Sequence, residues 1–214
     1  MTARPVLHGA RYSVYVRTAL MALQEKGVAH DLVEVDIFAP GGPPAEHLRR
    51  HPFGRIPAFD HDGFTLYETA AITRYVDEAF AGPALQPADV RGRARMTQII
   101  GILDSYAYRP LVWDIYVERV SNPAAGRPVD EARIAAALPR AALCLDVLDG
   151  FLGDGPWLLG DALTLADLHA APILDYFRMA PDAAPLLARH PGLMAWWDRI
   201  AARPSAAVLG KAGA

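Results

Sequence analysis

The sequence predicts a small α/β domain followed by a larger all-helical domain. Over residues 1–80, short extended runs alternate with runs of helical periodicity. Residues 81–88 carry two prolines and form the expected linker. Beyond them the strand-like alternation disappears, and prolines separate successive helical runs. We therefore expect residues 89–214 to form the all-helical domain.

The first domain should follow the order strand, helix, strand, loop, strand, strand, helix. Val16, Leu20 and Leu23 recur with helical spacing, and Gly27 is placed to end that helix. The turn-forming residues Asp60 to Gly63 separate two short extended runs. The expected strands are residues 4–10, 28–38, 56–59 and 64–67, and the expected helices are 13–27 and 69–80, with a possible short helix at 45–51.

The second domain is predicted to consist of helices alone. At the start of one of them, Thr164 is placed to cap the helix and Asp167 to reach back to it. This is the pattern of a capping box with Asp in place of Glu, so we assign Asp167 a structural role and no catalytic one. The expected helical runs are residues 89–120, 130–151, 164–179 and 192–202.

Composition argues against several classes of function. The 214 residues are 52% hydrophobic and 21% charged, and a net charge of −3 gives no reason to expect nucleic acid. The basic run Arg91 to Arg95 is expected to be a solvated or subunit-contact surface. The first residues lack an apolar signal core, and no apolar run approaches the roughly 18 residues that span a membrane. The single cysteine, Cys144, excludes an intramolecular disulfide, so we expect a cytoplasmic protein.

Several common catalytic and metal-binding motifs are missing from the sequence. It has no glycine-rich phosphate loop, no nucleophile elbow and no zinc motif that combines histidine with cysteine. His47 and His51 have the i, i+4 spacing that a metal ion could use on a helix. Because two arginines and a proline lie beside them, we expect both histidines to be surface residues and predict no metal.

The junction between the first strand and the first helix is the most informative stretch. A helix that begins near Ser13 presents unpaired N–H groups and the positive end of its dipole, which stabilise an anion such as a thiolate. The junction offers the hydroxyls of Tyr12, Ser13 and Tyr15 but no cysteine, so a reacting sulfur must arrive with the substrate. Ser13 can donate a hydrogen bond to a thiolate; alternatively, it only caps the helix.

Four segments in register resemble the glutathione S-transferase family. They are SVYVRTALMALQEKGV, HPFGRIPAF, LYETAAITRYVDE and, in the helical half, LTLADL. The chain is most similar to the serine-type branches, particularly the phi-like and related bacterial enzymes. The resemblance implies a thioredoxin-like N-terminal domain, an all-helical C-terminal domain, cytoplasmic transferase activity and a homodimer. It places Ser13 at the position of the catalytic serine, with Tyr12 and Tyr15 as alternatives.

The same resemblance implies two sets of contacts with glutathione, the expected co-substrate. A cis peptide bond would precede Pro57 and expose the backbone of Ile56 to the cysteinyl part of glutathione, as an added strand would. Glu68 and Thr69 would bind the γ-glutamyl group at the start of the following helix.

The loop APGGPPAEH departs from the phi-like pattern. Glycine and prolines stand where many relatives place basic residues for the glycyl carboxylate of glutathione. Arg50 or Arg55 is left to meet that carboxylate, although Arg55 is also placed to be a plain surface residue.

The second substrate is expected to be a small, apolar electrophile. By resemblance it binds between the two domains, against the first helices of the helical half. Of the aromatic residues there, we select Tyr108 and Trp113 as pocket residues, while Tyr106 and Tyr116 fit a core role equally well. The expected reaction is conjugation of glutathione to such electrophiles. The alternatives are a glutathione-dependent isomerase, dehalogenase or peroxidase, or a non-catalytic scaffold with the same fold.

Overall fold

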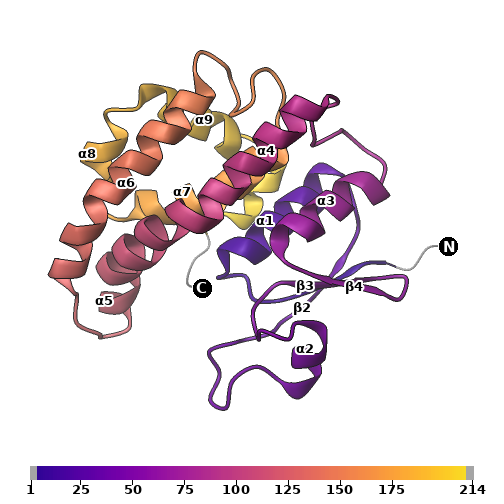
Figure 1. Ribbon diagram of the computed structural model, residues 1–214. Coiled ribbons are helices and arrows are strands. Elements are labelled where there is room, and N and C mark those ends of the chain that lie inside the picture. The colour runs from indigo at the N-terminus through magenta and orange to yellow at the C-terminus, as the bar shows by residue number, and fades with distance from the viewer. Residues whose placement is uncertain (1–3, 211–214) are drawn as a thin grey trace. The chain divides into compact units, whose positions relative to one another are not determined.

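The computed structural model describes residues 4–210, which form two compact units (Figure 1). The first unit contains residues 4–84 together with 204–210, and the second contains residues 85–203. The change of unit falls inside the stretch that the sequence marks as a linker. Residues 1–3 and 211–214, which the predicted domains include, lie outside the described residues.

A four-stranded sheet in the order β2-β1-β3-β4 forms the centre of the first unit. β1 (Val6–His8) is parallel to β2 (Asp31–Val33) and antiparallel to β3 (Ala58–His61). β3 pairs in turn with the antiparallel β4 (Phe64–Tyr67). The single parallel pair and the hairpin together give the strand order of a thioredoxin-like domain.

Helices cover both faces of this sheet. The helices α1 (Val14–Glu25) and α3 (Thr69–Ala79) lie side by side on one face, and the short α2 (Ala45–Arg50) lies on the other (Figure 1). The residues whose spacing predicted α1 are all buried, as an amphipathic helix on a sheet requires. The thioredoxin-like fold implied by the resemblance is therefore present, and the possible short helix is formed.

Two strands differ from their predicted bounds. β2 is shorter than residues 28–38, because it pairs only with β1, which is itself three residues long. β3 begins after Pro57, which has no N–H to donate to a neighbouring strand. It also ends later than predicted, because only Asp62 and Gly63, with φ angles of 48° and 80°, form the hairpin turn.

The last described segment of the chain packs with the α/β unit. The short helix η3 (Pro204–Val208) contacts α1, and the Ser205 hydroxyl donates a hydrogen bond to the Glu25 carboxylate. The predicted helical domain of residues 89–214 therefore extends too far at its C-terminal end. A short helical segment carries no sequence mark of the unit on which it packs, so composition and periodicity could not reveal this.

The second unit is built from helices. The predicted run 89–120 is one continuous helical stretch that changes to wider, π-type turns after Ile102. The five-residue α8 was not predicted. In chain order the helices are α4 (Val90–Ile102), η1 (Leu103–Ala107), η2 (Arg109–Ser121), α5 (Asn122–Ala124), α6 (Glu131–Leu152), α7 (Leu165–Met179), α8 (Ala183–Leu187) and α9 (Pro191–Ala201).

Helix α7 lies within the core of the second unit, since every residue from Leu165 to Phe177 is buried. Its start is fixed by Asp167, whose carboxylate accepts hydrogen bonds from the Thr164 N–H at 2.8 Å and the Thr164 hydroxyl at 3.0 Å. The same carboxylate accepts from the N–H of Leu158 and the indole of Trp196, both at 2.9 Å. The predicted capping box is confirmed.

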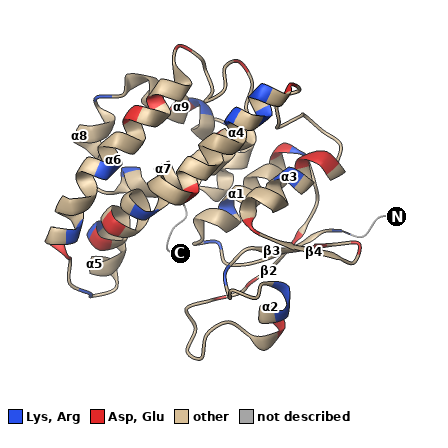
Figure 2. Ribbon diagram, in the orientation of Figure 1, with Lys and Arg blue, Asp and Glu red and all other residues tan. Residues whose placement is uncertain are grey.

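Charged residues occur on the helices and loops of both units (Figure 2). The basic run at the start of α4 is exposed, as expected for a solvated surface. None of the helices between residues 4 and 210 combines the length and the apolar composition that a membrane span needs.

Candidate functional site

Three chain segments meet at one end of the sheet, at the edge formed by the last residues of β1 and β4 and the first residue of β3. His8 at the end of β1 lies opposite Ala58 at the start of β3. Ala58 also lies opposite Tyr67, so the end of β4 is at the same edge. The register therefore gathers the residues that follow β1, precede β3 and follow β4; among them are Ser13, Ile56, Pro57, Glu68 and Thr69.

Gly9 lets two of these segments approach closely. A Cβ atom at this position would lie 2.5 Å from Cγ2 of Val16 and 3.3 Å from Cβ of Ile56. The first separation is shorter than van der Waals contact allows, so any side chain here would push α1 away from the segment before β3. Gly9 thus keeps the start of α1 beside Ile56.

Ser13 is the N-cap residue of α1. Its backbone is extended (φ −75°, ψ 126°), and its Oγ accepts a hydrogen bond from the Val16 N–H at a long 3.4 Å. No acidic side chain lies in the first turn of the helix to neutralise the positive end of its dipole. The Ser13 hydroxyl donates to none of the described residues, so its proton is available to an anion placed at the helix end.

Tyr12, the neighbouring alternative, is already engaged. Its hydroxyl donates a hydrogen bond to the Asp36 carboxylate at 2.9 Å. Partial burial and this carboxylate raise the pKa of Tyr12 to about 12. A hydroxyl bound to a carboxylate is a weaker partner for a second anion. Tyr15 is half-buried in the first turn of α1.

The bond between Ile56 and Pro57 is cis, as the resemblance implied. Both residues are buried, so their conformation is set by the surrounding unit. Within residues 4–210, no backbone group pairs with the N–H or the C=O of Ile56. Backbone groups without a partner are expected to bind a ligand or water, because leaving them unsatisfied is costly.

Glu68 adopts an uncommon backbone conformation where β4 meets α3. Its φ angle is 70° and its ψ angle 117°, in a region that residues other than glycine rarely occupy. Such a conformation costs about 1–3 kcal/mol and is often found at ligand sites. The side chain of Glu68 is exposed, and the following Thr69 is buried at the first position of α3.

Arg50, one of two candidates for the glycyl carboxylate of glutathione, is held by acidic neighbours. It donates to Asp60 at 2.8 Å and to Glu46 at 2.9 Å. Hydrogen bonds to these two carboxylates raise the pKa of Arg50 further above its usual range. Burial alone would raise the pKa of Asp60, but hydrogen bonds from Thr65, Arg50 and His8 outweigh it and lower that pKa. Arg50 is therefore committed to this cluster.

Arg55, the other candidate, is exposed, and its side chain forms no hydrogen bond or ion pair with a described residue. Its backbone carbonyl is bound instead, because Nε2 of His47 lies 2.6 Å from the Arg55 oxygen. Of the two arginines, only Arg55 has a guanidinium group available to an anionic ligand.

The prediction that His47 and His51 are surface residues is wrong. Each is only 3% exposed, because α2 turns this face inward and leaves Arg49 exposed. The ring of His51 packs on Tyr67 with a centroid separation of 4.8 Å. No group of three or more histidine, cysteine, aspartate or glutamate side chains among residues 4–210 is placed to hold a metal ion.

The aromatic candidates of the second unit divide into three environments. Tyr108, between η1 and η2, and Trp113, within η2, are half-buried. Tyr116 is a core residue whose ring packs on Tyr176 at 4.3 Å between centroids. Tyr106 is 68% exposed and belongs to neither the core nor a covered pocket wall in this unit.

Comparison with known proteins identifies the family. A family model described as "Glutathione S-transferase, N-terminal domain" matches residues 7–84, and one described as "Glutathione S-transferase, C-terminal domain" matches residues 106–204. A probable glutathione S-transferase of Oryza sativa subsp. japonica is 31% identical, over 96% of this chain and 97% of the relative. The chain belongs to the glutathione S-transferase family.

Solved transferase structures share the fold of both units. The theta class glutathione S-transferase of Xanthomonas axonopodis pv. citri, with glutathione bound, has a TM-score of 0.86 at 29% identity and covers 99% of each chain. Glutathione S-transferase I from maize, in complex with an atrazine glutathione conjugate, has a TM-score of 0.85 at 26% identity. That match covers 99% of this chain and 100% of the maize chain.

Sequence reasoning missed two residues around the candidate site. Asp36 lies 24 positions from Tyr12, and no local pattern links the two. The sequence relates His47 only to His51, four residues on, whereas its contact with Arg55 crosses the loop between α2 and β3. The buried side of a six-residue helix is too short to be read from periodicity, so the sequence carried no usable signal for either residue.

Proposed function

We propose that this glutathione transferase ionises bound glutathione at the start of α1 and transfers the thiolate to small, apolar electrophiles. The observation that carries the proposal is the state of Ser13. Its hydroxyl caps α1 with one long hydrogen bond, has no acceptor among the described residues and follows the strand that ends beside Ile56. A hydrogen-bond donor at the positive end of a helix suits a sulfur anion.

In the proposed reaction the chain stabilises the thiolate without removing its proton itself. The thiol of glutathione should have an ordinary pKa near the ~8.5 of cysteine, and each unit by which binding lowers it corresponds to about 1.4 kcal/mol. The Ser13 hydroxyl and the helix end both favour the anion, so the thiol loses its proton to solvent near neutral pH. The thiolate then forms a bond to the electrophilic carbon while the leaving group departs with its electron pair, or it adds to a conjugated double bond.

The rest of the tripeptide would lie along the same sheet edge. The unpaired backbone of Ile56, beside the cis bond to Pro57, supports pairing with the cysteinyl part of glutathione in the manner of an added strand. The strained Glu68 and the buried Thr69 at the start of α3 support binding of the γ-glutamyl ammonium and carboxylate. The available guanidinium group of Arg55 supports its pairing with the glycyl carboxylate.

The electrophile would be bound by aromatic residues of the second unit. Tyr108 and Trp113 remain the candidates, because both are half-buried and Tyr116 is used by the core. The maize transferase structure holds an atrazine glutathione conjugate, and displacement of a leaving group is one of the two proposed reactions, which makes an aryl halide the first substrate to test.

Replacement of Ser13 tests the proposal. The Ser13→Ala variant should lower kcat with an aryl halide by about 30-fold and move the acidic limb of the pH–rate profile to higher pH, because the bound thiol regains a more ordinary pKa. Glutathione affinity, measured by calorimetry, should change less than threefold.

Thr69→Ala provides the matched contrast. It should weaken glutathione affinity without moving the pH–rate profile, because Thr69 is assigned to the other end of the tripeptide. Loss of the N-cap should cost Ser13→Ala only about 1 kcal/mol of stability, so a folded variant is expected. An unchanged pH profile in Ser13→Ala would transfer the sulfur contact to another hydroxyl.

We also infer a homodimer in the cytoplasm. Phe53 is 73% exposed and Leu48 is 42% exposed, and a second copy that packed on these two apolar side chains would remove them from water. Cys144 is a free, buried thiol, which suits a reducing compartment. Sedimentation of the native chain and of Phe53→Ser tests the dimer; a native monomer at micromolar concentration would refute it.

A further inference from the structure

His47 makes one hydrogen bond, to the backbone of Arg55, which directly precedes Ile56 of the proposed glutathione site. It lies in α2 with 3% of its surface exposed, and its Nε2 is 2.6 Å from the carbonyl oxygen of Arg55. A carbonyl oxygen can only accept, so Nε2 carries the proton and donates it. Nδ1, the other ring nitrogen, is buried and has no hydrogen-bond partner in the described part of the chain. The bond to Arg55 is therefore the one polar contact that fixes this ring.

The peptide group that His47 holds also carries the N–H of Ile56. The bond between Arg55 and Ile56 is trans, since the cis bond found among the described residues is the one that follows Ile56. In a trans peptide group the C=O and the N–H point in opposite directions within one plane. When His47 holds the carbonyl toward α2, the N–H of Ile56 must point away from α2. That N–H pairs with no backbone group in residues 4–210.

We propose that His47 is a positioning residue for glutathione. By holding the carbonyl of Arg55 it fixes the plane of the Arg55–Ile56 peptide group and directs the N–H of Ile56 toward the cysteinyl carbonyl of the bound tripeptide. The inference rests on the proposed function, in which the backbone of Ile56 pairs with glutathione.

The loop around this peptide group needs such a support. Gly54 has a positive φ of 61°, and a Cβ there would lie 3.2 Å from Cγ of Pro43 and 3.4 Å from Cδ2 of Leu48. The segment is thus packed against α2 on one side, but Arg55 itself is exposed. Without the His47 bond, no hydrogen bond from the described residues would hold this peptide group, and glutathione would have to order it on binding. Pre-organisation by His47 removes that cost from the binding step.

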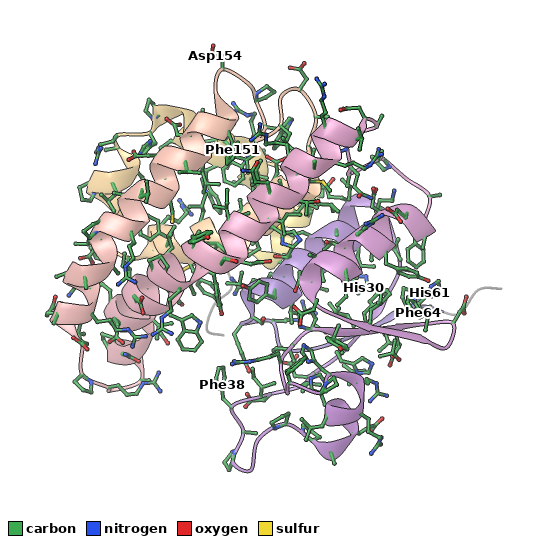
Figure 3. All side chains as sticks on the ribbon, viewed as in Figure 1. His30, Phe38, His61, Phe64, Phe151 and Asp154 are labelled. Atoms are coloured by element: carbon green, nitrogen blue, oxygen red, sulfur yellow. The ribbon has the colours of Figure 1, made fainter. Side chains whose placement is uncertain are left out.

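The test compares three variants of the full-length enzyme. His47→Leu removes the donor, and His47→Gln places an amide N–H close to the position of the lost Nε2. His61→Leu is the control, because His61 is also a buried histidine of the first unit with one hydrogen bond, to the Tyr75 hydroxyl. It lies at the hairpin end of β3 beside Phe64 (Figure 3). Glutathione affinity is measured by calorimetry, and kcat and both KM values are measured with an aryl halide.

The expected result is a selective loss of glutathione binding. His47→Leu should weaken glutathione binding about tenfold and raise its KM to match, with kcat at saturating glutathione and the KM of the aryl halide changed less than twofold. His47→Gln should recover most of the affinity. His61→Leu should lower the melting temperature by a similar amount but bind glutathione like the native enzyme. If His47→Leu does not fold, His47→Asn, whose amide is too short to reach Arg55, takes its place.

A spectroscopic readout reports on Ile56 directly. In protein labelled with ¹⁵N-isoleucine, the amide signal of Ile56, assigned through Ile56→Val, should move downfield when glutathione binds to the native enzyme and move less in His47→Leu. Equal affinity in His47→Leu and the native enzyme, or an equal loss in His61→Leu, would overturn the inference while leaving the proposed function intact. A native enzyme that binds no glutathione would overturn both.

Discussion

The starts of α1 and α7 solve the same physical problem in opposite ways. Each helix begins with N–H groups that have no partner within the helix. At α7, Asp167 and its four hydrogen bonds close the helix end inside a buried cluster. At α1, Ser13 provides one bond of 3.4 Å, no acidic residue lies in the first turn, and the cap is half-exposed.

The difference separates a structural helix end from the one to which we assign the proposed function. At the start of α7 the Asp167 carboxylate complements the helix dipole and accepts the Thr164 N–H, while the Leu85 carbonyl accepts the Leu165 N–H at 2.9 Å, so these donors are not available to a ligand. The start of α1 keeps its positive potential and a hydroxyl proton available, which is the state required to stabilise an incoming thiolate. The weaker cap is therefore the one that the proposed mechanism uses.

The largest effect on stability should follow from removing the carboxylate that closes the start of α7. Asp167→Ala leaves four buried donors, from Leu158, Thr164 and Trp196, without an acceptor, and should lower the free energy of unfolding by about 4 kcal/mol. Urea titration followed by tryptophan fluorescence measures this change. Asp167→Asn, which keeps one acceptor oxygen, should lose about half as much.

Glutathione binding provides the control for this prediction. Under conditions where Asp167→Ala is folded, it should bind glutathione as tightly as the native enzyme, because the cluster holds only the second unit together. A variant that is fully stable but fails to bind would reverse the roles given to the two helix ends.

The converse change closes the open end. Ser13→Asp should improve the cap of α1 and raise stability by up to about 1 kcal/mol, because Asp is a strong N-cap residue and complements the dipole. The added negative charge would repel the thiolate, so kcat/KM with an aryl halide should fall about 100-fold. Thermal unfolding and steady-state kinetics give the two numbers. Loss of both stability and activity would mean that the helix end is not open in the sense proposed.

Both helix ends show how far the sequence could predict this molecule. The capping box of α7 is local, with Thr164 and Asp167 three residues apart, and the pattern predicted it correctly. Ser13 was likewise found as the first residue of a helix that follows a strand. Alternation and periodicity predicted the α/β domain and the all-helical domain, because both patterns depend on residues that are close in the sequence.

Interactions between distant residues could not be predicted in this way. The sequence leaves Tyr12 open as an alternative to Ser13, because its partner Asp36 belongs to another loop. The charged neighbours of His47 predict a surface residue, whereas tertiary packing buries it. Arg50 and Arg55 looked interchangeable until Asp60, on the middle of the sheet, was seen to hold the first. Pairings set by the fold carry no signal in a single sequence.

Acid should lower the folding stability of the second unit through the buried His169. Complete burial in α7 lowers the pKa of His169 from 6.5 to about 3. Below pH 6.5 the unfolded chain therefore binds a proton at His169 that the folded chain does not bind. The stability contribution of the neutral His169 is full above that pH and falls as the pH drops toward about 3. The slope from this one site reaches about 1.4 kcal/mol per pH unit.

Urea titrations at pH 7, 6 and 5 test this prediction. His169→Leu should be less stable at pH 7 but lose less stability on acidification than the native enzyme. Parallel pH dependences of the two proteins would mean that His169 takes up its proton at an ordinary pH, and that the core around α7 is less dry than its burial indicates.

The smallest effect is expected beside the open helix end. Tyr12→Phe removes a hydroxyl that donates to Asp36 and whose pKa is about 12, so the group stays neutral and engaged throughout an assay between pH 6 and 9. We expect kcat/KM to change less than threefold and the pH–rate profile to keep its position, with a stability loss of about 1 kcal/mol for the lost hydrogen bond. The measurement is the same pH series used for Ser13→Ala. A tenfold loss of activity with a displaced profile would mean that Tyr12 leaves Asp36 when glutathione binds, and that the anion is stabilised by a tyrosine rather than by the cap of α1.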